Sequence, residues 1–296
     1  MHEGAGRRGY AVAVMANDLV WRFGPYSLEC GRRTHVMGII NVTPDSFSDG
    51  GRFFDPEDAV RAGMAMVEDG ADLLDVGGES TRPGSDSVSP EEELRRVLPV
   101  VKRLAAEVNV PISIDTRKAE VAKVALDAGA TVVNDITAGR DAEMFEVVRE
   151  AGAGMILMHM QGDPKTMQDE PRYDDVVREV KDFLAEREAA AESSGIPRDG
   201  LSVDPGLGFG KTLQHNLTLM RDIGSMAEIG RPVLVGPSRK SFVGRVTDSE
   251  VDERLGGTAG AVAWLAAHGA HIVRVHDVRE MVRVVRMVDA VRTAKT

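Results

Sequence analysis

The chain has 296 residues, of which 43% are apolar and 28% are charged, so it can bury a full hydrophobic core and fits one large domain better than two small ones. Its 36 basic and 47 acidic residues give a net charge of -11, which argues against a general affinity for nucleic acid or for an anionic membrane surface. The single cysteine, Cys30, excludes an intrachain disulfide framework and a cysteine-rich metal site.

The sequence favours a cytoplasmic protein. It has no run of about 18 apolar residues, and residues 1–16 lack the long apolar segment and cleavage pattern of a secretory signal. We predict a flexible N-terminal extension over residues 1–16 and one folded domain over residues 17–296.

The folded part begins with a predicted β-hairpin. Between Asp18 and Arg33, two short stretches of alternating apolar and polar residues flank Gly24-Pro25, which is typical of two strands joined by a turn. Such a hairpin could close the bottom of a barrel.

After the hairpin, short apolar runs alternate with longer amphipathic stretches, which predicts parallel strands linked by helices. The eight predicted strands cover residues 36–41, 72–76, 111–115, 131–134, 154–159, 201–204, 232–236 and 271–276. The eight predicted helices cover residues 56–69, 90–107, 117–128, 142–150, 173–194, 213–223, 253–268 and 278–291.

Eight such units in about 260 residues predict a (β/α)₈ TIM barrel in the α/β class. Pro56 and Pro90 suit the first turn of a helix. Five glycines suit the ends of helices, where a left-handed backbone is common: Gly70, Gly129, Gly152, Gly195 and Gly269. The alternative, an open doubly wound sheet, would need a glycine-rich dinucleotide turn after its first strand, and the sequence NVTP at residues 41–44 is not one.

In a TIM barrel the active site lies at the carboxyl ends of the strands. The polar residues at those positions are Asn41, Asp75, Asp115, Asn134, His159, Asp204, Ser238, Arg239, Lys240, Arg274 and His276. Any one of them could simply cap a helix or begin a turn. Together they favour a site for a flat heterocycle with many donors and acceptors, and the basic residues of the last two loops favour an anionic group on it.

These stretches resemble one known family, the dihydropteroate synthases. The matching motifs appear in the family's order and are GIINVTPDSFSDGG at residues 38–51, DVGGESTRPG at 75–84, IDT at 114–116, VNDI at 133–136, MHM at 158–160, DPGLGFGK at 204–211, SRK at 238–240 and RVHD at 274–277. One departure is Leu207, where the family often has phenylalanine.

The resemblance implies a (β/α)₈ barrel, commonly dimeric, that joins 6-hydroxymethyl-7,8-dihydropterin pyrophosphate to para-aminobenzoate. The products are 7,8-dihydropteroate, used in folate biosynthesis, and pyrophosphate. We expect a dissociative mechanism, in which the bond to pyrophosphate breaks before the arylamine attacks. Because sulfonamides mimic para-aminobenzoate in this family, we also expect the protein to be a sulfonamide target.

The resemblance also implies roles for individual residues. The pterin would be bound by Asp115, Asn134, Met158, Asp204, Gly236, Lys240 and Arg274. The para-aminobenzoate would be bound by Phe47, Thr81, Arg82, Pro83, Phe209 and Ser238. The pyrophosphate would be bound by Asn41, Arg82, Arg274 and His276, with Asn41 also a ligand of Mg²⁺. The residues expected to be catalytic are Asn41, Asp115, Asp204, Lys240 and Arg274.

Two alternatives stay open from the sequence. A corrinoid-linked pterin methyltransferase resembles this barrel and would keep the pterin-binding carboxylates and amides. It would not need Phe47, residues 80–83 or a pyrophosphate site. A pterin-binding paralogue without turnover is the second alternative, against which the presence of Lys240, Arg274 and His276 argues.

Overall fold

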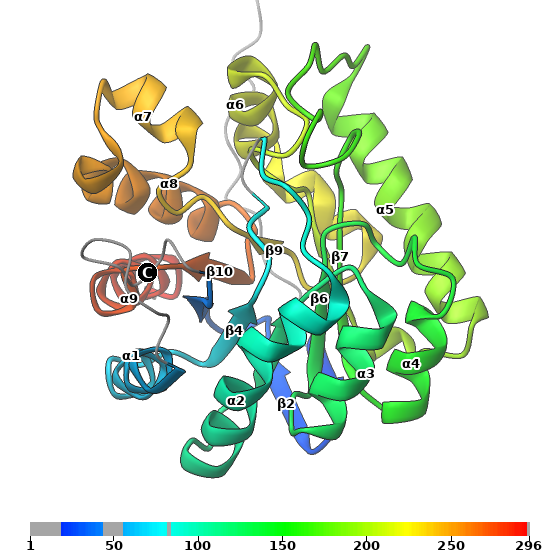
Figure 1. The fold of residues 1–296 in the computed structure, drawn as a ribbon. Helices are drawn as coiled ribbons and strands as arrows, with labels where there is room; N and C mark the ends of the chain where they lie inside the picture. The colour runs from blue at the N-terminus through cyan, green and yellow to red at the C-terminus, as the bar shows by residue number, and fades with distance from the viewer. Residues whose placement is uncertain (1–18, 44–55, 82–83, 295–296) are drawn as a thin grey trace, which may run out of the picture.

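Eight parallel strands form one sheet that curves into a barrel in the computed structural model, which describes residues 19–43, 56–81 and 84–294 (Figure 1). The strands are β3 (His35–Asn41), β4 (Leu73–Gly77), β5 (Ile112–Asp115), β6 (Val132–Asp135), β7 (Gly154–Met158), β8 (Leu201–Asp204), β9 (Leu234–Val235) and β10 (Ile272–Val275). They are ordered β8-β7-β6-β5-β4-β3-β10-β9, and a bridge between Val203 and Val233 nearly closes the circle. The predicted barrel is confirmed.

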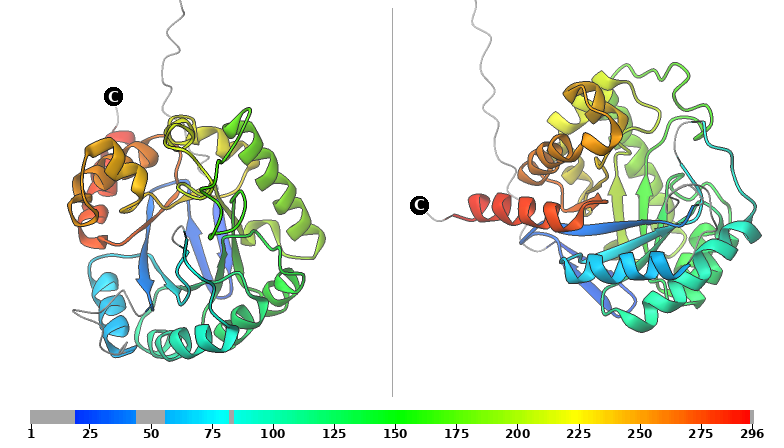
Figure 2. Two further views of the ribbon diagram at one scale, coloured as in Figure 1. Left: turned by 45° about the horizontal axis from the view of Figure 1, so that its top comes forward. Right: turned by 60° about the vertical axis from the view of Figure 1, so that its left-hand side comes forward.

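Helices surround the sheet, as the two views of Figure 2 show. They are α1 (Pro56–Glu68), α2 (Pro90–Glu107), α3 (Ala119–Asp127), α4 (Met144–Ala151), α5 (Val176–Ser193), α6 (Leu213–Arg221), α7 (Ser241–Thr247), α8 (Leu255–Ala267) and α9 (Val278–Arg292). Short 3₁₀ helices lie at η1 (Arg198–Gly200), η2 (Ile223–Ile229) and η3 (Val251–Glu253). None of the described helices combines the length and apolarity needed to cross a membrane.

The predicted helix ends agree with the backbone. All five glycines proposed as helix ends have positive φ, from 60° at Gly152 to 121° at Gly269. At the start of α2, Ser89 Oγ accepts from the backbone N–H of Glu92 at 3.3 Å, and Pro90 is the first helical residue. Helix α7 was not predicted, because its sequence SFVGRVT contains a glycine and two valines, which favour helix weakly.

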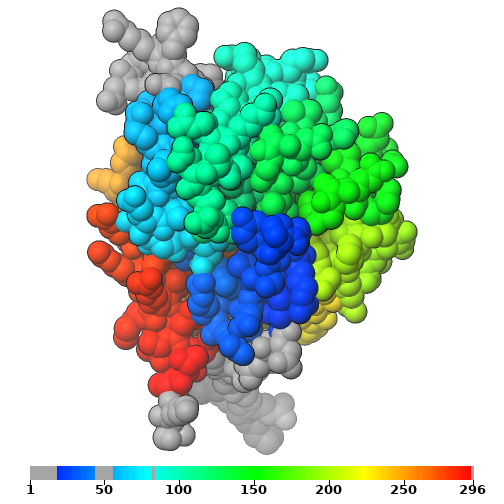
Figure 3. All heavy atoms as spheres, turned by 90° about the horizontal axis from the view of Figure 1, so that it is seen from below, coloured from blue at the N-terminus to red at the C-terminus, as the bar shows by residue number. Residues whose placement is uncertain are grey.

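The N-terminal hairpin, β1 (Val20–Phe23) and β2 (Tyr26–Glu29), closes the bottom of the barrel. Trp21 is fully buried, and its Nε1 donates to the carbonyl of Gly200 at 2.9 Å. It belongs to an apolar cluster with Met37, Leu73, Val132, Ile156, Leu234 and Ile272. Because these residues come from six barrel strands, the hairpin holds the floor together; Figure 3 shows it from below, in dark blue. The predicted extension, residues 1–16, lies outside the described residues.

Candidate active site

The carboxyl ends of four strands bring Arg274 together with three other predicted polar residues, Asp75, Asp115 and Asn134. Arg274 of β10 donates from Nε to Asp75 Oδ2 of β4 at 2.5 Å and from Nη2 to Asp115 Oδ2 of β5 at 2.7 Å. Asn134 of β6 donates from Nδ2 to the same oxygen of Asp75 at 3.0 Å. Asp75 is fully buried, and Arg274 compensates its charge. The contacts of Asp75 fix the positions of Arg274 and Asn134.

On the other side of the mouth, Asp204 and Lys240 carry opposite charges. Asp204 ends β8, and its Oδ1 accepts from the backbone N–H of Gly206 at 2.7 Å. Lys240 precedes α7, and its Nζ lies 3.9 Å from the centre of the Phe209 ring. In the described part of the chain, neither side chain has an ion-pair partner within 4.0 Å. We call Asp75, Asp115, Asp204, Lys240 and Arg274 the mouth cluster.

Burial shifts the pKa values of three members of the mouth cluster, Asp115, Asp204 and Lys240. It raises the pKa of Asp115 to about 7, although the charge of Arg274 opposes the shift, and it raises the pKa of Asp204 to about 6. Burial, together with the charge of Arg274, lowers the pKa of Lys240 to about 8. A ligand that donates hydrogen bonds to the two carboxylates would favour their ionised form, because such bonds stabilise the charge.

Asn41, Ser238 and His276 form a second group at the ends of β3, β9 and β10. His276 Nδ1 lies 3.0 Å from Ser238 Oγ, and its Nε2 lies 3.4 Å from Asn41 Nδ2. Burial, together with the charge of Arg274, lowers the pKa of His276 to about 3, so the ring is neutral at pH 7. With the ring proton on Nδ1, Nε2 accepts from Asn41 Nδ2, and the Asn41 oxygen has no donor among the described residues.

An apolar wall borders the polar groups. Met158, at the end of β7, packs in a cluster with Ile136, Met160, Met167 and Phe209. This wall offers a surface for the face of a flat ring, while Asp115, Asn134 and Asp204 offer polar groups for its edge.

The predicted residues near the arylamine are described only in part. Ser238 and Phe209 are buried, and Thr81 is partly exposed in the loop between β4 and α2. Gly236 lies beside Arg274, whose Cβ is 3.8 Å from the place where a Cβ on Gly236 would lie. Three predicted residues lie outside the described residues: Phe47, Arg82 and Pro83.

Two residues at the mouth were given no role from the sequence. In the sequence, Asp75 is one of several polar strand residues, although a carboxylate inside the otherwise apolar strand LLDVG is a sign of a buried charge pair. Lys211 ends the motif DPGLGFGK and is buried, with its Nζ 2.9 Å from His159 Nδ1. Nothing in the local pattern indicates that this lysine turns inward.

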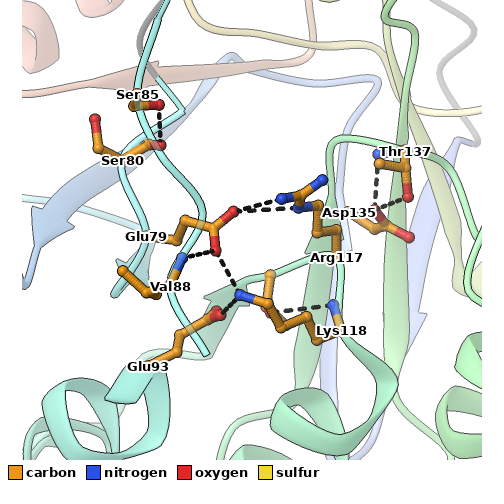
Figure 4. A network of polar contacts seen from close by, with 10 residues as sticks. Glu79, Ser80, Ser85, Val88, Glu93, Arg117, Lys118, Asp135 and Thr137 are labelled. Atoms are coloured by element: carbon orange, nitrogen blue, oxygen red, sulfur yellow. Dashed lines mark hydrogen bonds and ion pairs between the residues drawn. The ribbon is translucent and has the colours of Figure 1, made fainter. Parts of the chain in front are cut away.

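A further group of charges, which we call the rim cluster, lies just outside the mouth after β4 and β5 (Figure 4). Glu79 accepts from Arg117 Nε at 3.1 Å, from Lys118 Nζ at 2.5 Å and from the backbone N–H of Val88 at 3.1 Å. Lys118 Nζ also donates to Glu93, at 2.5 Å. Glu79 therefore links both ends of the β4–α2 loop to the segment that follows Asp115.

Comparison with known proteins agrees with this arrangement. A family model described as "Pterin binding enzyme" matches residues 37–276. The dihydropteroate synthase of Escherichia coli (strain K12) is 48% identical to this chain over 261 residues, which cover 88% of this chain and 93% of the relative. The chain belongs to the dihydropteroate synthase family. The match between this synthase and the Escherichia coli enzyme covers nearly the whole length of that enzyme.

Solved structures of dihydropteroate synthases share the fold of this synthase. The Xanthomonas albilineans enzyme in complex with 7,8-dihydropteroate is 43% identical, with a TM-score of 0.83 over 92% of this chain and 98% of that one. The Yersinia pestis enzyme in a sulfonamide drug complex is 41% identical, with a TM-score of 0.89 over 93% of this chain and all of that one (100%).

Proposed function

We propose that this synthase makes 7,8-dihydropteroate from 6-hydroxymethyl-7,8-dihydropterin pyrophosphate and para-aminobenzoate by using the mouth cluster to bind the pterin. The observation that carries the proposal is the pair Asp204 and Lys240, which lie in the mouth with opposite charges and no ion-pair partner among the described residues. Unpaired charges in a partly buried site are costly unless a ligand satisfies them. The dihydropteroate complex of the Xanthomonas relative supports the identity of that ligand.

The pterin edge suits these groups. A pterin presents ring N–H and exocyclic amine donors, which carboxylates accept, and a carbonyl, which an ammonium can bind. Asp115, Asn134 and Asp204 would face the donors and the amide-like edge, and Lys240 the carbonyl side. Arg274 occupies Oδ2 of Asp115, which leaves Oδ1 for the ligand. Met158 would lie against the ring, with Gly236 leaving space beside Arg274, whose planar guanidinium can stack on a heterocycle.

The pyrophosphate would lie near Asn41 and His276, with Arg274 and Arg82 supplying positive charge. These residues fit a Mg²⁺ ion held mainly by substrate oxygens and water: the described residues contain no group of three or more carboxylate, histidine or cysteine ligands, but Asn41 has an amide oxygen that no described residue occupies. When bound, the ion would neutralise part of the charge on the departing pyrophosphate.

The para-aminobenzoate would lie between Phe209 and Ser238 on one side and the β4–α2 loop with Thr81 on the other. Phe47, Arg82 and Pro83 belong to the same proposal from the family resemblance. The sulfonamide complex of the Yersinia relative supports sulfonamide binding by this synthase.

We propose a dissociative reaction that needs no protein nucleophile. The C–O bond breaks, its electron pair leaves with pyrophosphate, and the electron-rich pterin stabilises the methylene cation. The arylamine nitrogen then attacks this carbon and loses a proton. Ionised Asp115 and Asp204 stabilise positive charge on the pterin, while Arg274 stabilises negative charge on the leaving group.

The test is pyrophosphate release by purified protein with the pterin pyrophosphate and Mg²⁺, run with and without para-aminobenzoate and checked for dihydropteroate. Release coupled to dihydropteroate formation is the expected result, and a sulfonamide should compete with para-aminobenzoate. Pterin binding without release would favour the paralogue that lacks turnover, and methyl transfer from a methylated pterin would favour the methyltransferase.

We also propose a cytoplasmic homodimer. Supporting the dimer, exposed apolar residues gather on neighbouring helices α7, η3 and α8: Val246, Val251 and Leu255. Val246→Glu should convert a dimer to a monomer in light scattering, whereas Val291→Glu on α9 should not, although the two valines are similarly exposed (57% and 64%). A monomeric wild type would exclude the dimer.

The single cysteine, Cys30, is buried, which suits a reducing compartment.

A further inference from the structure

Lys211, the last residue of the DPGLGFGK motif, is a buried lysine whose ammonium group is fully used by the protein. Its Nζ lies 2.9 Å from each of three acceptors: Nδ1 of His159, the carbonyl of Gly206 and the carbonyl of Phe209. An ammonium has three protons, so each proton has one acceptor. The nearest remaining acceptor, the carbonyl of His159, lies at 3.4 Å. Lys211 therefore has no donor left for a substrate.

Nδ1 of His159 is the side-chain acceptor among the three that bind the Lys211 ammonium. Burial is the main cause that lowers the pKa of His159 to about 2, and the charge of Lys211 is the second, so the ring is neutral. Nδ1 accepts from Lys211, which leaves the ring proton on Nε2. The ring is fixed in place by Phe183, whose ring lies edge-on with its centre at 4.9 Å, and by Tyr173 at 6.0 Å. A rigid acceptor of this kind holds the ammonium at a defined position.

The two carbonyls that Lys211 binds belong to the residues that shape the mouth. The backbone of Gly206 contacts both charged groups: its N–H donates to the Asp204 carboxylate, and its carbonyl accepts from the Lys211 ammonium. Phe209 places its ring 3.9 Å from Lys240 Nζ while its carbonyl accepts from Lys211. Gly206 also has φ 67°, and a Cβ there would collide with the His159 carbonyl, so the loop passes β7 with no space to shift.

We infer that Lys211 and His159 are positioning residues for the pterin site: together they hold the β8–α6 loop so that Asp204 and Phe209 keep their places beside Lys240. The inference rests on the proposed function, because the roles of Asp204 and Phe209 in binding are proposed there. It adds a buried support behind the site that does not itself contact the pterin or the arylamine.

The comparison of the two lysines supports this division. Both lie near Asp204, whose charge favours the protonated form of each. Lys211 has three protein acceptors, whereas Lys240 has only the Phe209 ring among the described residues. Lys240 is therefore available to a ligand, and Lys211 is not.

The experiment measures dissociation constants for the dihydropterin pyrophosphate by calorimetry, together with KM and kcat. Lys211→Met replaces the aliphatic part of the side chain as far as Cε and removes all three hydrogen bonds. It should weaken pterin binding at least tenfold, with a smaller change in kcat. Lys181→Met is the control, because the Lys181 ammonium forms an exposed ion pair with Glu228 and not with a residue of this loop. It should change neither quantity more than twofold.

A matched pair at His159 isolates the acceptor. His159→Asn and His159→Leu both remove the ring and its packing on Phe183, but only asparagine places an oxygen near the former Nδ1. His159→Asn should bind the pterin within threefold of wild type, and His159→Leu should resemble Lys211→Met. This pair also decides the matter if Lys211→Met does not fold.

Three results would overturn the inference: wild-type pterin affinity in Lys211→Met, a loss of kcat without loss of affinity, or equal damage from asparagine and leucine at position 159. Binding measurements need no turnover, so they separate this inference from the proposed reaction. Wild type that binds pterin but forms no dihydropteroate would contradict the reaction alone.

Nitrogen NMR at pH 6 is a direct check of the contact. It should show a slowly exchanging Lys211 ammonium and an unprotonated His159 Nδ1, and an exchange-averaged ammonium would count against the contact.

Discussion

The mouth cluster and the rim cluster lie at the same end of the barrel and both combine carboxylates with lysine and arginine, but their charges are satisfied differently. In the rim cluster, both acids and both bases contact an opposite charge: Lys118 bridges Glu79 and Glu93, and Arg117 pairs with Glu79 (Figure 4). In the mouth cluster, Arg274 pairs with Asp75 and Asp115, but Asp204 and Lys240 have no such partner among the described residues. The incomplete pairing, rather than the presence of charge, marks the place for a ligand.

This difference has a physical basis. A buried or partly buried charge without a partner costs free energy, so a fold retains it only where something else, such as a substrate, compensates. Pairs that are already complete mainly hold segments together. If this explanation is correct, substitutions in the two clusters should separate loss of activity from loss of stability.

The largest expected effect is on turnover in the mouth cluster. Asp204→Ala and Lys240→Ala each remove a charge placed beside the proposed pterin, and loss of such a preorganised group typically costs about 10² to 10³ in rate. We expect kcat/KM for the pterin pyrophosphate to fall by at least that factor in both variants, measured by dihydropteroate formation. Near-normal turnover in both would refute the assignment of the pterin site.

The next effect is on pH dependence. Because burial raises the pKa of Asp204 to about 6 and of Asp115 to about 7, both carboxylates are ionised in the free enzyme only above these values. Burial lowers the pKa of Lys240 to about 8 and that of Lys211 to about 7, so cationic forms are lost above them. We expect kcat/KM for the pterin to pass through a maximum between about pH 6 and 8. Well below pH 6 it should fall about a hundredfold per pH unit, because both carboxylates must lose a proton. A profile that is flat from pH 5 to 9 would contradict the proposed protonation states.

A smaller effect is expected on stability, and its sign is opposite to that on activity. Between the ordinary pKa of 3.8 and the native value of about 6, folded Asp204 keeps a proton that the unfolded chain releases. The free energy of unfolding therefore falls as pH rises through this window. Asp204→Asn retains an acceptor for the Gly206 N–H and removes the buried charge. The melting temperature of this variant should exceed that of wild type at pH 8, and the difference should vanish near pH 4. A melting temperature below that of wild type at pH 8 would show that the charge is stabilising.

The smallest effect on activity is expected in the rim cluster. Glu79→Gln removes a carboxylate that is already paired, so it should lower the free energy of unfolding by about 1 to 3 kcal/mol while changing kcat/KM less than threefold. Glu188→Gln is a matched control. The side chain of Glu188, on α5, is 9% exposed, against 8% for Glu79, and it also bridges two cations, Arg198 and Arg231. The two variants should behave alike in denaturant titrations and activity assays. A rate loss of a hundredfold for Glu79→Gln alone would place the rim cluster within the active site.

The sequence was sufficient for the barrel because its signals are local. Each strand is a short apolar run, and glycines such as Gly152 and Gly269 end helices where only the left-handed backbone fits. The polar residue at the end of a strand is also a local feature, so Asp115, Asn134 and Asp204 could be placed at one mouth once the barrel was predicted. The strand limits differ from the prediction by a residue or two, most visibly at β9, which covers only two residues.

Partnerships across the barrel could not be predicted in the same way. The contact between Asp75 and Arg274 joins residues 199 positions apart, and it depends on how β3 separates β4 from β10. The inward turn of Lys211 depends on three acceptors, one of which comes from β7 through His159. Helix α7 forms although its own sequence favours helix weakly, because it packs on α8.

The hydrogen bond between Trp21 and Gly200 also bears on the order in which the chain acquires its structure during synthesis. The hairpin emerges from the ribosome before the barrel strands, yet its partners include Gly200, Leu234 and Ile272, which emerge long afterwards. Contacts of such high sequence separation form late, since a long loop must close before they are gained. The indole of Trp21 is therefore exposed until most of the chain has been made, and its burial would report the completion of the barrel.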